Sequence, residues 1–329
     1  MTMIILLLVI VLIGLTCGEC DTIKLHSFNI HDSITISGLS SGGYMAVQMH
    51  IAYSGTINGS AIFAGGPFYC AEGSLEFAEE KCMATTLGLP QVQKLVDLTI
   101  TDYSLGYIDS PNNLKDDKIY IFSGKLDTVV DQKVVKSLQN YFDAFVHTSN
   151  IVADYNVDAE HCIPTLNYGE ECSTLSSPYI GNCNYDGAGK ALQVLLGPGL
   201  TRGQAKLSNL YAFDQTPYFV GTSTSIGDVG YIYIPSSCIS NKCYLHISFH
   251  GCEQNLDIIG NQYAVNSGFN DWAEANGIIV LYPYVETSNV NPYNPNGCWD
   301  WFGYSGYDYG VKSGVQMRFV KRLIDTVKG

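Results

Sequence analysis

Short apolar runs and amphipathic stretches alternate along most of this 329-residue chain. Runs of about four to eight apolar or β-branched residues between turn residues indicate strands, and apolar residues at every third or fourth position indicate helices. The pattern predicts strands at 33–37, 60–64, 118–123, 151–157, 230–235, 244–250 and 277–282, and helices at 43–53, 131–145, 266–276 and 312–327. Such alternation favours an α/β fold with a mainly parallel sheet and helices on both faces.

Two segments depart from this pattern. Residues 164–225 are rich in Gly, Ser and Tyr with weak periodicity, so we expect a loop-rich excursion that forms a lid or rim over the site. Met3–Leu15 is an apolar run without charge, short for a membrane span and followed by small residues. It is typical of a secretory signal peptide cleaved after Gly18; an uncleaved membrane anchor is the alternative. Residues 19–329 then form a single domain.

Cysteine usage agrees with export. Loss of Cys17 with the signal peptide leaves ten of the 11 cysteines, and an even number in an exported chain implies disulfide bonds. No CxxC…CxxC pattern and no His-rich tract is present, so we expect no metal site. The candidates for local bridges are Cys70 with Cys82 and Cys238 with Cys243, and further disulfide candidates are Cys172 and Cys183.

The net charge of the chain argues against some classes of binding partner. The formal net charge is −14 with only 17 Lys and Arg, which argues against nucleic acid and anionic membrane surfaces. The low charged fraction of 15% and the 23 tyrosines suit a stable secreted fold, and also adsorption to an uncharged polymer. Asn58-Gly59-Ser60 permits one N-glycan at Asn58. We expect a monomer, outside the cell or in a digestive vacuole, with no stable membrane insertion once the signal peptide is removed.

The segment Gly38-Leu39-Ser40-Ser41-Gly42 is a G-x-S-x-G motif between a predicted strand and a predicted helix. Only Ser40 has glycines two residues before and after it. A strand-to-helix turn is so tight that side chains at those flanking positions would clash, and the turn presents the serine hydroxyl clear of the backbone. Ser40 is therefore a candidate nucleophile. A Gly-rich turn without chemistry is the alternative, because the motif is short.

A nucleophilic serine needs a base and a residue that orients the base. Of the seven histidines, His161 in DAEHCIPT follows a predicted strand and falls in a loop, where a catalytic base is expected. Asp127 follows the strand KIYIFS after a glycine turn. The order Ser40, Asp127, His161 is that of α/β-hydrolases. For the acid, Asp131, Asp158 and Glu160 are the reserves.

The second half of the chain carries the motif that an α/β-hydrolase normally has before its nucleophile. The oxyanion loop, often His-Gly followed by a residue that donates its N–H, precedes the serine in that fold. Here ISFHGCEQN lies far downstream, at the end of a predicted strand. A circular permutation would produce this order, and it would also explain why Ser40 comes so early.

Five motifs together resemble one known family. GLSSGGYMA, SGKLDTVV, AEHCIPT, HGCEQN and NPNGCWDWFGY are similar to segments of the secreted single-domain polyhydroxybutyrate depolymerases, which are circularly permuted α/β-hydrolases. The resemblance runs over nearly the whole mature chain, with the motifs in the right order. It implies Ser40 as nucleophile, Asp127 as acid and His161 as base, with the backbone N–H groups of Ser41 and Cys252 as the oxyanion hole, and it implies no cofactor.

On this basis we expect a secreted serine esterase that hydrolyses short aliphatic hydroxyacid polyesters or their oligomers. The loop around Cys252 needs support to hold its N–H in place, and Cys298 is the expected disulfide partner. Trp299 and Trp301 either line an ester-binding cleft or pack the core beneath that bridge. The alternatives are a feruloyl or acetyl esterase that acts on plant polysaccharide, and a non-catalytic binding protein on a hydrolase scaffold.

Overall fold

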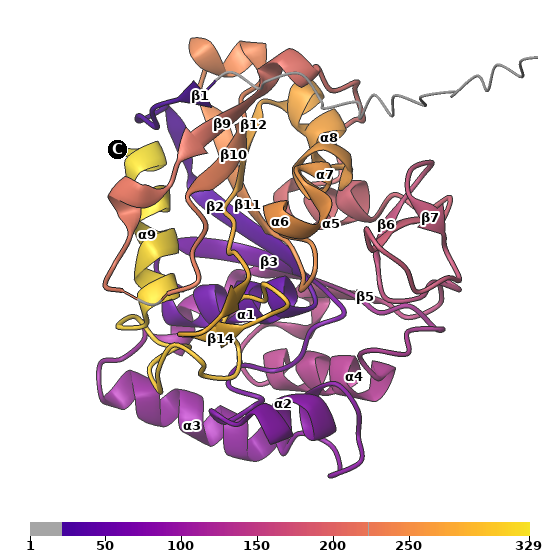
Figure 1. Cartoon of the computed structure of the whole chain (residues 1–329), viewed down its shortest axis with the longest axis vertical. Helices are drawn as coiled ribbons and strands as arrows, with labels where there is room; N and C mark the ends of the chain where they lie inside the picture. Colours follow the sequence, from indigo (N-terminus) through magenta and orange to yellow (C-terminus); the bar gives the residue numbers. More distant parts are fainter. Residues whose placement is uncertain (1–21, 223) are drawn as a thin grey trace, which may run out of the picture.

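The protein is described by a computed structural model, which covers residues 22–222 and 224–329. The predicted signal peptide, its cleavage site after Gly18 and Cys20 lie outside the described residues. The fold is built on a nine-stranded sheet in the order β1-β9-β10-β12-β11-β2-β3-β4-β5 (Figure 1). In that order the strands are Thr22–Ile23, Leu210–Asp214, Val229–Tyr233, Ile278–Tyr282, Cys243–Phe249, Ile30–Leu39, Ile57–Phe63, Lys118–Phe122 and Ile151–Asp154.

The six strands from β12 to β5 pair in parallel, as the sequence predicts. Strand β10 is antiparallel to both β9 and β12, so one end of the sheet is mixed. Strands β10 and β11 are consecutive in the sequence and separated by a short turn, yet β12 lies between them in the sheet. The carboxyl ends of the parallel strands share one edge, and the loops after β2, β4 and β11 therefore meet there.

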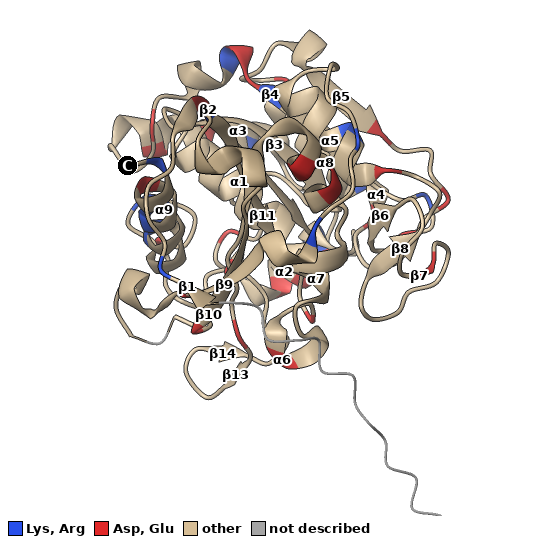
Figure 2. Ribbon diagram, turned by 90° about the horizontal axis from the view of Figure 1, so that it is seen from above, with Lys and Arg blue, Asp and Glu red and all other residues tan. Residues whose placement is uncertain are grey.

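Helices cover both faces of the sheet. Figure 2 shows α1 (Ser41–Ala52) and α9 (Val315–Lys328) on one side and α5 (Gly187–Leu196) and α8 (Phe269–Asn276) on the other. The remaining helices are α2 (Leu75–Cys82), α3 (Val92–Ser104), α4 (Gln132–Phe142), α6 (Leu256–Ile259) and α7 (Gln262–Asn266). Every residue of α1 is buried, which explains why its apolar residues are not confined to one face.

The excursion predicted for residues 164–225 contains more regular structure than its sequence indicates. A small sheet of β6 (Ile163–Thr165), β8 (Ile180–Asn182) and β7 (Glu170–Glu171) opens it, and α5 and β9 follow. The prediction of a loop-rich excursion did not include α5, whose two early glycines weaken the helical pattern. A Cβ at Gly189 would lie 2.3 Å from the ring of Trp272, so close packing between α5 and α8 requires that glycine.

Four disulfides cross-link the described part of the chain: Cys70–Cys82, Cys172–Cys183, Cys238–Cys243 and Cys252–Cys298. All eight of these cysteines are among the candidates named from the sequence. Cys162, which was not among those candidates, is buried and keeps a free thiol. None of the helices within 22–222 and 224–329 is long and apolar enough to cross a membrane.

Candidate active site

Ser40 lies on the turn between β2 and α1 in a strained backbone conformation. Its φ of 56° falls in the left-handed region, which residues with a side chain rarely adopt. A Cβ at Gly38 would lie 2.1 Å from the carbonyl oxygen of Gly42. The first glycine of the motif is therefore a steric requirement of the turn, as expected from the sequence.

The second glycine brings α1 against the end of β11. A Cβ at Gly42 would lie 2.3 Å from the carbonyl oxygen of His250, which is just beyond the last residue of β11. This contact places Ser41, the first residue of α1, next to the loop that carries Cys252. The N–H of Ser41 has no acceptor within the helix, because the first N–H groups of any α-helix lack one.

The loop after β11 also leaves one N–H free. Gly251 N–H donates to Gln254 Oε1 at 2.7 Å, and Glu253 N–H donates to Asn296 O at 2.7 Å. Between them, the N–H of Cys252 has no acceptor among the residues that the structure describes. Two unpaired backbone donors, those of Ser41 and Cys252, thus flank the Ser40 turn, which is the arrangement that can hold an oxyanion.

His161 and Asp127 form the second half of the site. Asp127 Oδ2 accepts a hydrogen bond from His161 Nδ1 at 2.9 Å, and both side chains are more than nine-tenths buried. Asp127 Oδ1 accepts from the N–H groups of Val129 and Val130 at 2.9 and 2.8 Å. The two backbone bonds fix the carboxylate of Asp127, and this carboxylate in turn orients the ring of His161. Neither His161 Nε2 nor Ser40 Oγ has a hydrogen-bond partner among the described residues.

Glu160 supports this pair, although the sequence indicated it only as a reserve acid. Its carboxylate is buried and accepts from the N–H groups of His161 at 2.7 Å and Thr128 at 3.2 Å, so it joins the loops that carry the base and the acid. The other two reserves lie elsewhere. Asp131 caps α4, and Asp158 forms an ion pair with Lys125 in a largely exposed position.

His250 is a neutral positioning residue of the loop after β11. Its Nδ1–H donates to Gly251 O at 2.7 Å, its Nε2 accepts from Val285 N–H at 3.3 Å, and its ring stacks on Tyr284. Burial lowers the pKa of His250 to about 4, although the bond to Gly251 acts in the opposite direction. A histidine bonded through both nitrogens and buried in this way has no free nitrogen for proton transfer.

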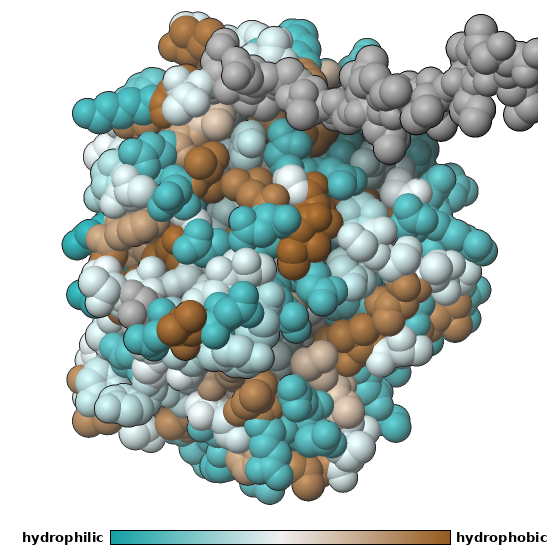
Figure 3. All heavy atoms as spheres, in the orientation of Figure 1, coloured by the Kyte–Doolittle hydropathy of each residue, from teal (hydrophilic) through white to brown (hydrophobic). Residues whose placement is uncertain are grey.

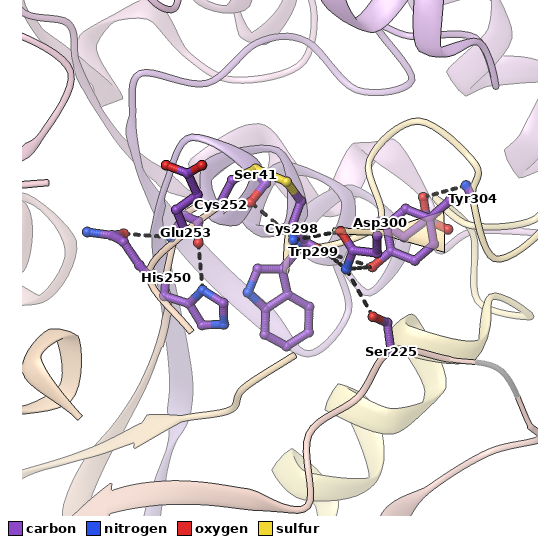
Figure 4. The surroundings of a disulfide bond; sticks show 12 residues. Ser41, Ser225, His250, Cys252, Glu253, Cys298, Trp299, Asp300 and Tyr304 are labelled. Carbon is purple, nitrogen blue, oxygen red and sulfur yellow. Dashed lines mark hydrogen bonds between the residues drawn. A yellow bond between two sulfur atoms is a disulfide. The ribbon is translucent and has the colours of Figure 1, made fainter. Parts of the chain in front are cut away.

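The disulfide between Cys252 and Cys298 ties the same loop to the segment before α9 (Figure 4). Asn294 Oδ1 accepts from Cys298 N–H and its Nδ2 donates to Cys298 O, both at 2.9 Å. Trp299 N–H donates to Ser41 Oγ at 3.3 Å. The bridge therefore belongs to a network that reaches from Cys252 to the first residue of α1, and the expected pairing of Cys252 is present.

A cavity of about 390 Å³ lies above these groups, a size typical of a small-ligand site. Its lining is mainly apolar and includes Leu39, Ser40, His161, Cys252, Trp301 and Phe302. The candidate nucleophile, base and one unpaired N–H thus face one volume.

The two tryptophans have different positions. Trp301 lines the cavity and stacks on Tyr44 with ring centroids 4.1 Å apart. Trp299 has no exposed surface and packs edge-to-face on Phe249, so of the two alternatives the core position holds for Trp299, and it is not a cleft residue. The reason is geometric: in an irregular loop, residues two apart do not keep to one face.

A polar pair in the cavity wall was not expected from the sequence. Tyr179 OH donates to Glu253 Oε2 at 2.5 Å, and both side chains line the cavity. The bond to Glu253, followed by burial, raises the pKa of Tyr179 to about 12. Tyr179 comes from the excursion after His161, so the excursion does form part of the rim. Within the described residues no cluster of three or more His, Cys, Asp or Glu side chains could hold a metal ion.

Comparisons with known proteins point to one family. A family model described as esterase PHB depolymerase matches residues 229–328. A poly(3-hydroxybutyrate) depolymerase from Delftia acidovorans is 44% identical over 299 residues, which are 89% of this chain and 59% of the relative. The chain thus spans about three fifths of that relative's length. A polyhydroxybutyrate depolymerase from Talaromyces funiculosus is 35% identical over 338 residues, 97% of each chain.

Two solved structures are similar to this chain over most of its length. A PHB depolymerase complexed with an R3HB trimer superimposes with a TM-score of 0.85 at 35% identity, over 93% of this chain and 99% of the other. The crystal structure of PHB depolymerase from Penicillium funiculosum gives a TM-score of 0.84 with the same identity and coverage.

Proposed function

This chain belongs to the PHB depolymerase family of esterases, and we propose that it is a secreted carboxylic ester hydrolase for short aliphatic hydroxyacid polyesters, such as poly(3-hydroxybutyrate) or its oligomers. The observation that carries this proposal is the shared cavity. The strained Ser40, His161 with its bond to Asp127, and Cys252 with its unpaired N–H all border one mainly apolar cavity.

The reaction proceeds by acyl transfer. Ser40 Oγ attacks the ester carbonyl carbon while His161 Nε2 takes its proton, and Asp127 keeps the other ring nitrogen protonated and stabilises the imidazolium. The tetrahedral intermediate collapses, and His161 returns the proton to the leaving alkoxide. Water, activated by His161, then attacks the acyl-enzyme and releases the acid. The Ser40–His161 hydrogen bond forms when substrate is present, since such bonds are often open in unliganded sites.

The N–H groups of Ser41 and Cys252 stabilise the oxyanion. Each donor is preorganised: one by the start of α1, the other by the loop that His250 and the disulfide hold. Removal of one such donor typically costs roughly 3–4 kcal/mol of transition-state stabilisation. The glycines of the motif and the Cys252–Cys298 bridge therefore contribute to catalysis because they hold these two N–H groups in place.

The cavity and its rim suit an uncharged aliphatic chain. Leu75, Leu175 and Tyr293 line the cavity and keep between 43% and 65% of their surface exposed, so a polymer chain could lie across them into the site. The face in Figure 3 shows apolar side chains as separate patches between hydrophilic ones. We assign contact with the polymer to the apolar rim at the cavity.

A labelling and substrate panel tests the proposal. A fluorophosphonate probe should label the chain at Ser40, and Ser40→Ala should remove the label. Poly(3-hydroxybutyrate) film and its soluble trimer should be hydrolysed faster than feruloyl sugars or acetylated xylan, with Ser40→Ala as the background control. Preference for the plant-derived esters would replace the substrate class, and absence of both labelling and hydrolysis would refute the enzyme assignment.

A further inference from the structure

A second pocket lies away from the candidate active site, between α3 and the loop before α9. It has a volume of about 320 Å³, and no residue lines both pockets. Helix α3 lies at the periphery of the molecule in Figure 1. We call this feature the tyrosine–aspartate pocket, after six of its lining residues: Tyr69, Leu98, Asp102, Tyr107, Tyr307 and Asp308.

Asp102 is an unpaired carboxylate in the wall of this pocket. The residue is only 8% exposed, and its carboxylate makes no hydrogen bond or ion pair with any residue that the structure describes. Burial raises its pKa, and no cationic side chain offsets that effect. The cations on neighbouring segments are already paired, Lys94 with Glu72 and Lys312 with Asp109.

The position of Asp102 on its helix adds to the negative field. It lies in the last turn of α3, where the helix dipole is negative and where this helix has no basic residue. Asp308 lines the same pocket from the opposite segment. Burial, followed by the charges of Asp102 and Asp308, raises the pKa of Tyr69 to about 12, so both carboxylates act on that hydroxyl.

Three tyrosines, Tyr69, Tyr107 and Tyr307, line the pocket beside Leu98, Val311 and Ser313. Tyr69 stacks on Tyr309 with ring centroids 4.8 Å apart, and its hydroxyl donates to the carbonyl oxygen of Tyr307. These contacts hold the loop that carries Tyr307, whose own side chain is 91% exposed, and Tyr107 on the facing side is 50% exposed. Two tyrosine side chains are therefore open to a ligand without any rearrangement of the core.

We propose that the tyrosine–aspartate pocket binds a small organic ammonium ion of about the size of choline. A buried carboxylate without a partner supplies the counter-charge, and aromatic faces attract alkylated ammonium groups by cation–π interaction. A metal ion fits less well, because calcium requires six to eight oxygen ligands and the described residues around the pocket contain no cluster of three or more potential metal ligands. The volume is close to the lower end for small-ligand sites.

Calorimetric titration of the full-length protein with choline tests whether binding requires the positive charge of the ligand. Choline should bind, and dimethylbutanol, its neutral isostere, should bind at least tenfold more weakly. Asp102→Asn should weaken choline binding at least tenfold, whereas Asp97→Asn, on an exposed side of the same helix, should leave it unchanged. Equal binding of choline and its isostere, equal binding by Asp102→Asn, or no binding at millimolar choline would overturn the proposal.

A second pair of variants tests the aromatic wall and guards against misfolding. Tyr307→Ala should weaken choline binding roughly threefold, while Tyr103→Ala, an exposed tyrosine outside the pocket, should not. An unchanged affinity in Tyr307→Ala would contradict the aromatic contact. Ester hydrolysis and thermal unfolding should stay close to wild type in Asp102→Asn, because the pocket shares no residue with the active site.

The ammonium group could be a free solute or the headgroup of a lipid. Sedimentation with phosphatidylcholine vesicles separates these sources. Cosedimentation that is lost in Asp102→Asn would assign a lipid headgroup, and choline binding without cosedimentation would assign a soluble ligand. Cosedimentation that Asp102→Asn leaves unchanged would mean that vesicles bind elsewhere, and it would count against this pocket as their site.

Discussion

Two groupings of serine, histidine and aspartate lie near opposite ends of α1, and only the one at its N-terminus faces a cavity. The buried grouping is centred on His50 in the last turn of the helix. His50 Nδ1 bonds to Ser60 Oγ on β3 at 2.8 Å, and its Nε2 bonds to Asp117 Oδ2 at 3.0 Å. All three side chains are buried, so this grouping ties α1 to β3 and to the turn before β4.

The grouping at the N-terminus has the same residue types with a different state of pairing. His161 is bonded to Asp127 through Nδ1 only, and Ser40 is partly exposed on a strained turn at the cavity. His50 has both nitrogens engaged, whereas His161 keeps one without a partner among the described residues. Catalysis thus requires a free ring nitrogen and an open hydroxyl, and a closed set of hydrogen bonds turns the same residues into a structural clamp.

Replacement of the two serines should separate these roles most clearly. Ser40→Ala should reduce kcat by roughly 10⁴-fold or more and abolish fluorophosphonate labelling, because the nucleophile is lost. Ser60→Ala should keep kcat within about twofold, and Ser41→Ala should be far milder than Ser40→Ala, because its N–H remains. Steady-state kinetics and labelling decide, and equal losses at Ser40 and Ser41 would contradict the assignment.

The next largest losses of kcat are expected on replacement of the base, His161, and the acid, Asp127. His161→Ala and Asp127→Asn should each lower kcat by roughly 10³–10⁴-fold, through loss of the base and of the correct tautomer. Asp158→Asn is the matched control, since Asp158 is in the same loop region but exposed and paired with Lys125. A wild-type rate in His161→Ala, with a large loss in Asp158→Asn, would require another assignment of the base and acid.

The Cys252–Cys298 bridge should affect both rate and stability. Its removal by alanine should lower kcat about 10²-fold with a smaller change in KM, because the Cys252 N–H matters most in the transition state. Its sequence separation of 46 corresponds to about 4 kcal/mol of chain-entropy stabilisation. The control is Cys238–Cys243, with a separation of 5, whose removal should cost about 2 kcal/mol and no turnover. Equal losses of turnover in both variants would contradict the positioning role.

The parts of the fold that the sequence predicts are those with strong periodicity. Strands β2, β3, β4, β11 and β12 and helix α9 appear close to their expected bounds, because buried strands and an amphipathic helix leave regular apolar patterns. Helix α5 was not predicted because glycine is a poor helix former, and Gly187 and Gly189 lie near the start of this helix. Close packing against Phe63 and Trp272 leaves too little room for a larger side chain at these two positions. Such tertiary contacts leave no periodic signal in the segment itself.

The candidate site divides in the same way. Ser40 is recognisable because its two glycines answer a local steric requirement, and Asp127 and His161 follow from chain order and loop position. The contact between Tyr179 and Glu253 joins loops far apart in the sequence, and neither loop carries a sign of the other. His50 gives no indication in the sequence of its serine and aspartate partners, so the buried grouping could be found only in the folded structure.

Disruption of the buried grouping should cost stability and spare catalysis. His50→Ala should lower the free energy of unfolding by about 3 kcal/mol, because it leaves a cavity and a buried Asp117 without its partner. Ser60→Ala should cost about 1 kcal/mol, the value of a buried hydrogen bond. Denaturant unfolding measures both. A kcat loss in His50→Ala comparable with that of His161→Ala, at unchanged stability, would mean that the buried grouping acts in the reaction.

The last expected effect appears only at acidic pH and concerns two other buried histidines, which should make the fold sensitive to acid. Burial lowers the pKa of His246 to about 3 and that of His250 to about 4. Between those values and the ordinary pKa near 6.5, the unfolded chain binds protons that the folded chain does not, so the free energy of unfolding falls as the pH drops below about 6.5. Each histidine should contribute a loss on the order of 2 kcal/mol by pH 4.5.

Urea unfolding from pH 7 to 4.5 measures this slope. His246→Gln should flatten the slope relative to wild type, because glutamine does not titrate, whereas His26→Gln, at an exposed position, should leave it unchanged. His246 is hydrogen-bonded to Thr35 and Ser37, so the variant will start from a lower stability at pH 7, and the slope rather than the absolute value is the quantity to compare. An unchanged slope in His246→Gln would show that this histidine does not remain neutral in the fold.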